Sequence, residues 1–271
     1  MKTVMCAVAR TENIYLEEWC KFYLDMGFEH IYLFDNNDDT DPDIRDSLSQ
    51  EILDKMTIFN VHGQSDHSAQ TNWYLQFYSQ YGNTFDWCAF FDIDEFLFGI
   101  DNINEFLSQD KFKGKEQILI KWKLFGDDGY IERDMSIPVH EFFKIDNVAR
   151  EPINKLLGKA MIAGHLPNGL PADMNCHFCR GLSTCYPSGR VTQPKRYLID
   201  WPVNEIVYLN HYRTKTLKEF LMTKLVRQTR IYSSTPVTLS QYYFKVNEWT
   251  PEKQAFVDKW FAEHPEVAGR N

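Results

Sequence analysis

The chain has 271 residues, of which 44% are hydrophobic and 15% aromatic, so it can bury a substantial core. It carries 38 acidic and 29 basic residues, which gives a formal net charge of -9. This negative balance argues against nucleic acid as a partner, because phosphate polymers are bound by basic surfaces.

The first hundred residues alternate between apolar runs and amphipathic stretches. Asn13 is the expected N-cap of the first helix and Gly27 its stop. Strands that alternate with helices indicate βαβ units, so we predict an α/β fold with a Rossmann-like, mostly parallel sheet. The expected strands are 3–8, 31–34, 56–61 and 87–91, and the expected helices are 13–26, 44–53 and 66–81.

The second half has a different composition. Seven of the 11 prolines lie within residues 138–202, which predicts loops over a ligand site rather than long regular elements. A strand at 206–209 precedes a helix that opens with a capping box from Thr216 to Glu219, and a last helix covers 251–261. We predict a main domain over residues 1–215, with C-terminal helices over 216–271 packed on it.

Export and membrane signals are missing from the sequence pattern. The first apolar run is too short for a signal peptide, and no window reaches the roughly 18–20 apolar residues of a membrane helix. Three of the six cysteines sit inside apolar runs, as reduced core residues do. We expect a cytoplasmic protein without a transmembrane segment; peripheral membrane contact stays open.

Polar residues follow three of the expected strands. Parallel sheets bind ligands beyond the carboxyl ends of their strands, so one nucleotide can touch all three segments. Asp35 suits a hydrogen bond to a ribose or a base, although the run 36–41 is also typical of a plain turn. The segments are Arg10-Thr11-Glu12, Asp35-Asn36-Asn37 and Asp92-Ile93-Asp94-Glu95.

The third of these segments crowds three carboxylates between apolar neighbours. Two like charges about 4 Å apart repel by roughly 4 kcal/mol at an effective dielectric near 20. Asp92 and Asp94 share one face of an extended chain, so Mg²⁺ or Mn²⁺ between them would relieve the repulsion. Alternatively, these acids cap the helix that begins near Asn102 or stay in water.

Further polar residues point to the same chemistry. Arg213 and Lys215 precede a helix N-terminus, where cations are unfavourable, and so indicate an anion between them. His211 either ligates the metal, contacts a diphosphate or is structural. Gln70 and Tyr74, one helical turn apart, either face the ligand or pack.

The ordered motifs resemble those of the family 92 glycosyltransferases and are similar to bacterial family-2-like enzymes of surface polysaccharide assembly. The resemblance implies a GT-A fold, a UDP-sugar donor, a Mn²⁺ or Mg²⁺ ion and inversion at the anomeric carbon. It aligns Asp92 and Asp94 with the family's D-x-D motif, Asp94 being the metal contact, and Asp35 with the acid that faces the nucleoside. The motifs that carry it are 6–13, 18–19, 27–28, 31–37, 87–97 and 210–215.

We therefore expect a metal-dependent glycosyltransferase whose acceptor is a glycan or a lipid-linked glycan. Asp127 or Asp128, in a glycine-flanked loop after a strand at 118–124, is the candidate base, although a hairpin turn explains them as well. The expected metal ligands are Asp92, Asp94 and His211. The expected donor contacts are Arg10, Glu12, Asp35, Gln70, Asp92, Arg213 and Lys215.

Other interpretations of the sequence remain open. A glycan-binding module would use the 7 Trp and 14 Tyr for stacking but leaves the clustered acids unexplained. A phosphatase would use Asp92 as nucleophile and Asp94 as acid, although Glu95 and the position on the fourth strand fit it poorly. Cys176, Cys179 and Cys185, with His177, resemble part of a zinc site. His177 could equally be an acceptor-site residue.

Overall fold

The computed structural model describes residues 1–64, 68–144, 158–170, 173–194, 201–202, 204–226, 239 and 248–268. The chain forms two compact units. The first comprises residues 1–64, 68–122 and 152–210, and the second comprises 65–67, 123–151 and 211–271. The predicted domain boundary at residue 215 stays a prediction.

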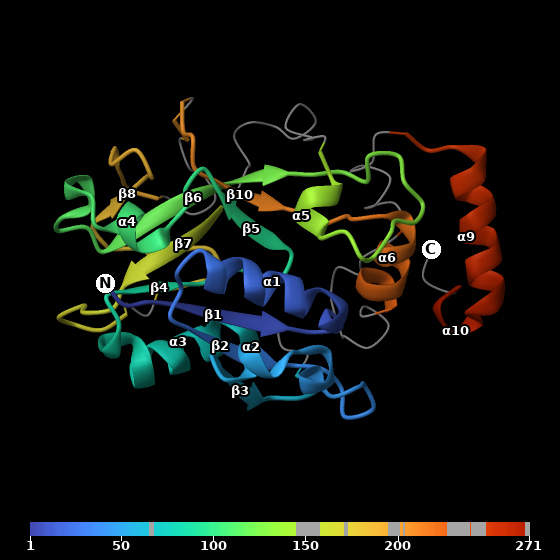
Figure 1. The fold of residues 1–271 in the computed structure, drawn as a ribbon, viewed down its shortest axis with the longest axis horizontal. Coiled ribbons are helices and arrows are strands. Elements are labelled where there is room, and N and C mark those ends of the chain that lie inside the picture. The colour runs from blue at the N-terminus through green and yellow to red at the C-terminus, as the bar shows by residue number, and fades with distance from the viewer. Residues whose placement is uncertain are drawn as a thin grey trace. The chain divides into compact units, whose positions relative to one another are not determined.

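The first half of the sheet is parallel, as predicted. Its strands run in the order β3-β2-β1-β4 (Figure 1). Apolar residues cover both faces of β1, which is the pattern of a central parallel strand. The strands are β1 (Thr3–Ala9), β2 (His30–Asp35), β3 (Met56–Asn60) and β4 (Trp87–Ala89).

The connecting helices follow the predicted ranges with two differences. Glu12, not Asn13, is the N-cap of α1 (Asn13–Asp25), and Gly27 follows that helix with a φ of 100°. The helix expected at 44–53 is two short pieces, because Leu48 is extended between them. These pieces are the 3₁₀ turn η1 (Ile44–Ser47) and α2 (Gln50–Leu53); α3 (Ala69–Tyr81) and the 3₁₀ turn η2 (Gly82–Thr84) complete this half.

The second half makes the sheet mixed, which corrects the prediction of a mostly parallel sheet. The order continues β4-β7-β6-β10-β5, and β7 (Gly158–Ala163) is antiparallel to both β4 and β6 (Gln117–Leu124). Residues 138–202, expected to be loops, therefore contribute a six-residue strand. The remaining elements are β5 (Glu95–Phe98), β8 (Thr184–Cys185), β9 (Val191–Thr192), β10 (Tyr208–His211), α4 (Ile103–Leu107) and the 3₁₀ turn η3 (Asp110–Phe112).

Aromatic side chains fill the core of the first unit. On one face of β2, Tyr32 lies 4.9 Å from Phe77 of α3, and Phe34 lies 5.8 Å from Trp73 of the same helix, measured between ring centroids. Each such pair adds about 0.5–1.5 kcal/mol beyond area burial. Helix α3 is thereby fixed against the strands whose ends carry the polar residues.

The second unit has its own apolar core and confirms the predicted capping box. The backbone N–H of Thr216 donates to Glu219, whose N–H donates to the Thr216 hydroxyl. Its helices are α5 (Val139–Phe142), α6 (Leu217–Phe220), the π-helical turn η6 (Leu221–Leu225), α9 (Pro251–Glu263) and α10 (Pro265–Ala268). The core contains Leu217, Phe220, Leu221, Leu225, Leu239, Val257, Trp260 and Val267.

Among the described residues, no helix combines the length and the apolar character needed to cross a bilayer.

Replacement of Gly99 by Ala should destabilise the protein more than the same change at Gly129. Both glycines have a positive φ, +92° and +88°, so each substitution costs about 1 kcal/mol in backbone strain. A Cβ at Gly99 would also lie 2.2 Å from the carbonyl oxygen of Ile206, whereas one at Gly129 would meet nothing within 4 Å. Urea unfolding should show at least about 2 kcal/mol more loss for Gly99→Ala. Equal losses would show that β5 and the chain entering β10 do not approach each other as described.

Candidate functional site

The side chain of Arg10 binds residues of the loops that follow β2 and β3. It comes directly after β1, and its side chain is 5% exposed. Its Nη2 lies 2.9 Å from Oδ1 of Asp38, and its Nη1 donates to the carbonyl of Gln64 at 2.8 Å. Glu12, the next acid along, is buried at the start of α1.

The loops after β1 and β2 are also joined by asparagine side chains. Asn37 accepts from the N–H of Thr11 at 2.8 Å, and Asn36 both donates to and accepts from the backbone of Gln64. Thr11 has a φ of 56°, which costs a β-branched residue of order 1–3 kcal/mol. We call Arg10, Thr11, Asp35, Asn36 and Asn37 the polar rim. Hydrogen bonds thus join each loop of the rim to another.

Asp35 lies in the rim beside a histidine that the sequence analysis did not single out. Its Oδ2 is 3.4 Å from Nε2 of His62, whose Nδ1 is 2.7 Å from Oδ1 of Asp39. The hydrogen bond to Asp39 raises the pKa of His62, opposed by partial burial and aided by the charge of Asp35. His62 lies just beyond the end of β3, and Asp35 is the last residue of β2. The position of His62 near a strand end was therefore the signal that could have identified it.

The third acidic segment forms a tight turn that α1 holds in place. The N–H of Glu95 donates to the carbonyl of Asp92, and the N–H of Asp92 donates to Oε2 of Glu95 at 2.9 Å. Trp19 Nε1 donates to the carbonyls of Asp92 and Glu95 at 3.0 and 3.1 Å. The hydroxyl of Tyr23 donates to the same Glu95 carbonyl at 2.9 Å. The turn that carries the acids is therefore anchored through its backbone.

Asp92 is paired with a buried lysine on β7. Its Oδ1 lies 2.7 Å from Nζ of Lys159, and Gln70 Nε2 donates to the same oxygen at 2.9 Å. Gln70 also donates to the hydroxyl of Tyr74 at 2.9 Å. The Lys159 side chain is 1% exposed and that of Asp92 is 33% exposed. The structure thus pairs the Asp92 carboxylate with a cation of the protein itself, and its role as a metal ligand stays a prediction.

Glu95 is the most deeply buried of the three acids. Burial raises the pKa of its carboxyl well above the usual range; Lys159 opposes the rise, and Asp92 and Asp94 add to it. Within the part of the chain that the structure describes, Oε1 of Glu95 has no hydrogen-bond partner. A buried carboxyl oxygen without a partner costs about 1–3 kcal/mol, so it calls for a proton or a cation.

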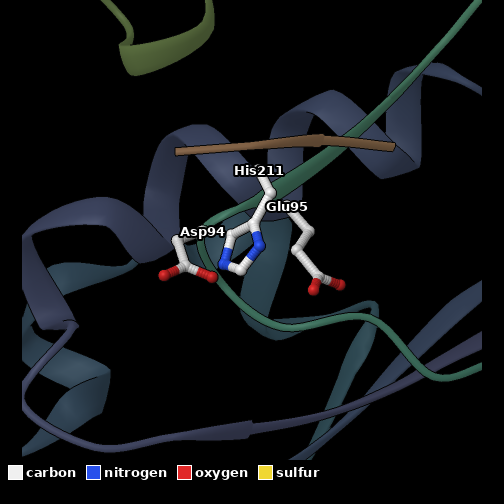
Figure 2. A group of neighbouring side chains, drawn as sticks. All are labelled: Asp94, Glu95 and His211. Atoms are coloured by element: carbon white, nitrogen blue, oxygen red, sulfur yellow. The ribbon is translucent and has the colours of Figure 1, made fainter. Parts of the chain in front are cut away.

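Asp94, Glu95 and His211 form a group that can hold a metal ion. One ligand atom from each lies within 4.8 Å of the others, and all three residues are buried. Figure 2 shows the imidazole of His211 between the side chains of Asp94 and Glu95. His211 ends β10, which neighbours β5 in the sheet, and Glu95 begins β5. The group keeps two of the three predicted ligands, Asp94 and His211, and has Glu95 where Asp92 was expected.

The remaining predicted residues lie in the second unit. Asp127 is fully buried, and its carboxylate accepts from Nζ of Lys253 and from the N–H of Gly129. Asp128 is partly exposed, with a φ of 49°, and accepts from the N–H of Lys144. The ion pair gives Asp127 a structural role, while the assignment of a base stays a prediction.

The two cations predicted to clamp a diphosphate differ in exposure. Arg213 is exposed, whereas Lys215 is buried and has a φ of 55°. Their contact with a diphosphate stays a prediction.

The cysteines do not form the metal site that their spacing resembles. All six are free thiols, and Cys6, Cys20 and Cys88 are buried as core residues. The Cys179 thiol donates a hydrogen bond to the carbonyl of Arg180 at 3.8 Å. Among the described residues, Asp94, Glu95 and His211 are the only convergent group of three potential ligands. The Nδ1 atom of His177 lies 3.2 Å from the carbonyl oxygen of Gly158.

No protein-family model matches this chain, and no curated protein matches it. The family resemblance of the motifs therefore stays a prediction, and the functional argument depends on the residues themselves.

Glu95→Gln should reduce the pH dependence of stability in metal-free buffer. A folded-state pKa above the unfolded value means that the folded protein binds a proton that the unfolded chain has released. The contribution of Glu95 to the free energy of unfolding is thus fully present below the usual glutamate pKa. It falls by about 1.4 kcal/mol per pH unit as the pH rises toward the raised pKa. Urea unfolding from pH 4 to 8 should show this slope reduced in Glu95→Gln and unchanged in the exposed control Glu105→Gln. Parallel wild-type and Glu95→Gln curves would contradict the burial of an ionisable Glu95.

Asp127→Asn should destabilise the second unit by about 3–5 kcal/mol, because it leaves Lys253 buried without its counter-charge. The double variant Asp127→Asn/Lys253→Met should recover most of that loss in thermal unfolding. Wild-type stability in the single variant, together with lost catalysis, would instead favour Asp127 as the base.

Proposed function

We propose that this protein is a metal-dependent, inverting glycosyltransferase of the GT-A type that transfers a sugar from a UDP-sugar to the hydroxyl of a glycan acceptor. One observation carries the proposal: Oε1 of Glu95, buried without a partner among the described residues, belongs to a group with Asp94 and His211 that can bind a cation. Carboxylates buried in this way need a positive charge.

The ligand types favour Mn²⁺ over Mg²⁺. Mg²⁺ takes oxygen ligands in a strict octahedron, and the group offers two carboxylates and an imidazole. Mn²⁺ accepts carboxylates and lies next to the imidazole-binding metals in affinity order. When bound, such an ion supplies Lewis-acid stabilisation to a departing diphosphate.

The polar rim supports a nucleotide as the second ligand. It lies at the carboxyl ends of parallel strands β1 and β2, where α/β sheets bind nucleotides. Asp35 would bind ribose or uracil, and the strained backbone at Thr11 is a feature that clusters at functional sites. Gln70 and Lys159 hold Asp92, leaving its partly exposed side chain to contact the donor.

The transfer itself also needs a proton acceptor on the acceptor side. Of the two predicted bases, Asp128 suits this role better, because it is partly exposed, whereas Asp127 is fully buried in an ion pair with Lys253.

UDP-sugar together with Mn²⁺ should raise the melting temperature more than GDP- or CDP-sugars do. Ligand at about 100 times its dissociation constant stabilises a protein by about 2.7 kcal/mol. Asp94→Asn should lose the Mn²⁺-dependent part of the shift and the transfer activity, because it removes a carboxylate ligand. The exposed control Asp110→Asn should keep both.

Other outcomes of the same screen would support the rival functions. Stabilisation by glycans alone, with no effect of any nucleotide, would favour a glycan-binding module. Release of phosphate from an aryl phosphate that depends on Asp92 would favour a phosphatase. An Asp94→Asn protein that still transfers sugar would disprove the metal-dependent mechanism.

A further inference from the structure

We propose that Lys159 is a positioning residue that binds the carboxylate of Asp92 and keeps it out of the ligand set of the cation. The inference rests on the proposed function, because it concerns the cation bound by Asp94, Glu95 and His211. It assigns a role to a residue that none of the sequence motifs includes.

The sheet register brings Lys159 to this place. β7 runs antiparallel to β4, with Ala89 opposite Met161, and the N–H of Phe90 donates to the carbonyl of Ala160. One step further along this register, Lys159 stands level with Phe91, the residue before Asp92. Its Nζ reaches Oδ1 of Asp92 at 2.7 Å.

A lysine at this position needs a specific partner. Its side chain is 1% exposed, in a strand whose other residues are apolar. Burial lowers the pKa of Lys159, but the attraction of Asp92 and Glu95 outweighs it and leaves the pKa above its usual value. That partner is the carboxylate of Asp92, whose Oδ1 lies 2.7 Å from the amine.

This ion pair separates the roles of the two aspartates. Oδ1 of Asp92 is occupied twice, by Lys159 and by Gln70, on the side toward β7 and α3. The carboxylate of Asp94 instead converges with Glu95 and His211. The positive charge of Lys159 also repels a divalent ion nearby. Lys159 therefore fixes the position of the Asp92 carboxylate and at the same time lowers the affinity of the site for the cation.

The experiment is a Mn²⁺ titration followed by electron paramagnetic resonance of the free ion, on folded proteins checked by thermal unfolding. Lys159→Met should bind Mn²⁺ about tenfold more tightly than the wild type, because a positive charge is removed and Asp92 is freed to join the ligands. Lys121→Met is the matched control on the adjacent strand, where Lys121 pairs with Gly158, and should bind like the wild type.

The double variant Asp92→Asn/Lys159→Met removes the ion pair as a neutral unit and covers the case in which Lys159→Met alone does not fold. It should keep Mn²⁺ affinity within about threefold of the wild type, whereas Asp94→Asn should bind at least about 100-fold more weakly. A lysine with only a structural role would not raise the affinity when it is removed.

The possible failures can be told apart. Unchanged or weaker Mn²⁺ binding by folded Lys159→Met overturns the positioning role, while the proposed function stands. A double variant that loses Mn²⁺ as completely as Asp94→Asn shows that Asp92 is itself a ligand and also overturns it. A wild-type protein that binds no Mn²⁺ overturns the proposed function and this inference together.

Discussion

The turn from Asp92 to Glu95 places three carboxyl groups where the protein solvates charge poorly, and the arrangement around it answers that constraint. Trp19 and Tyr23 fix the backbone of the turn through its carbonyls and leave its side chains for other partners. Lys159 compensates the charge of Asp92, while burial raises the pKa of Glu95. The helix, the turn and β7 therefore depend on one another, since moving any of them would expose or isolate a charge.

Much of the first unit was predictable because its signals are local. Apolar runs predicted the parallel strands, and the polar residues at the ends of these runs predicted the polar rim. Residues that follow successive parallel strands must meet at one edge of the sheet. Asp94 and His211 came from the same reasoning, each as a polar residue near the end of a strand. The capping box at Thr216 was equally local, being written within four residues.

The rest depends on partners that are distant in sequence. Lys159 is 67 residues from Asp92, inside a proline-rich stretch that gave no sign of a strand in register with β4. Spacing alone predicted Asp92 as a metal ligand and could not reveal the lysine beside it. The ion pair of Asp127 was missed in the same way, because its partner Lys253 lies 126 residues away on a helix that has an ordinary amphipathic pattern. Periodicity shows which face of an element is apolar, but it does not identify the partner of a buried charge.

The cost of these buried charges itself bears on function. Replacing a buried ion pair with apolar residues of similar size is often neutral or stabilising by about 1–4 kcal/mol. A chain selected for stability alone would have little reason to bury Asp94, Glu95 and Lys159 beside the partly exposed Asp92. The second unit shows the contrast, because Lys253 binds Asp127 and a backbone carbonyl and so links α9 to the loop after β6. Within the described part of the chain the second oxygen of Glu95 has no such partner, which is why a proton or a cation is expected there.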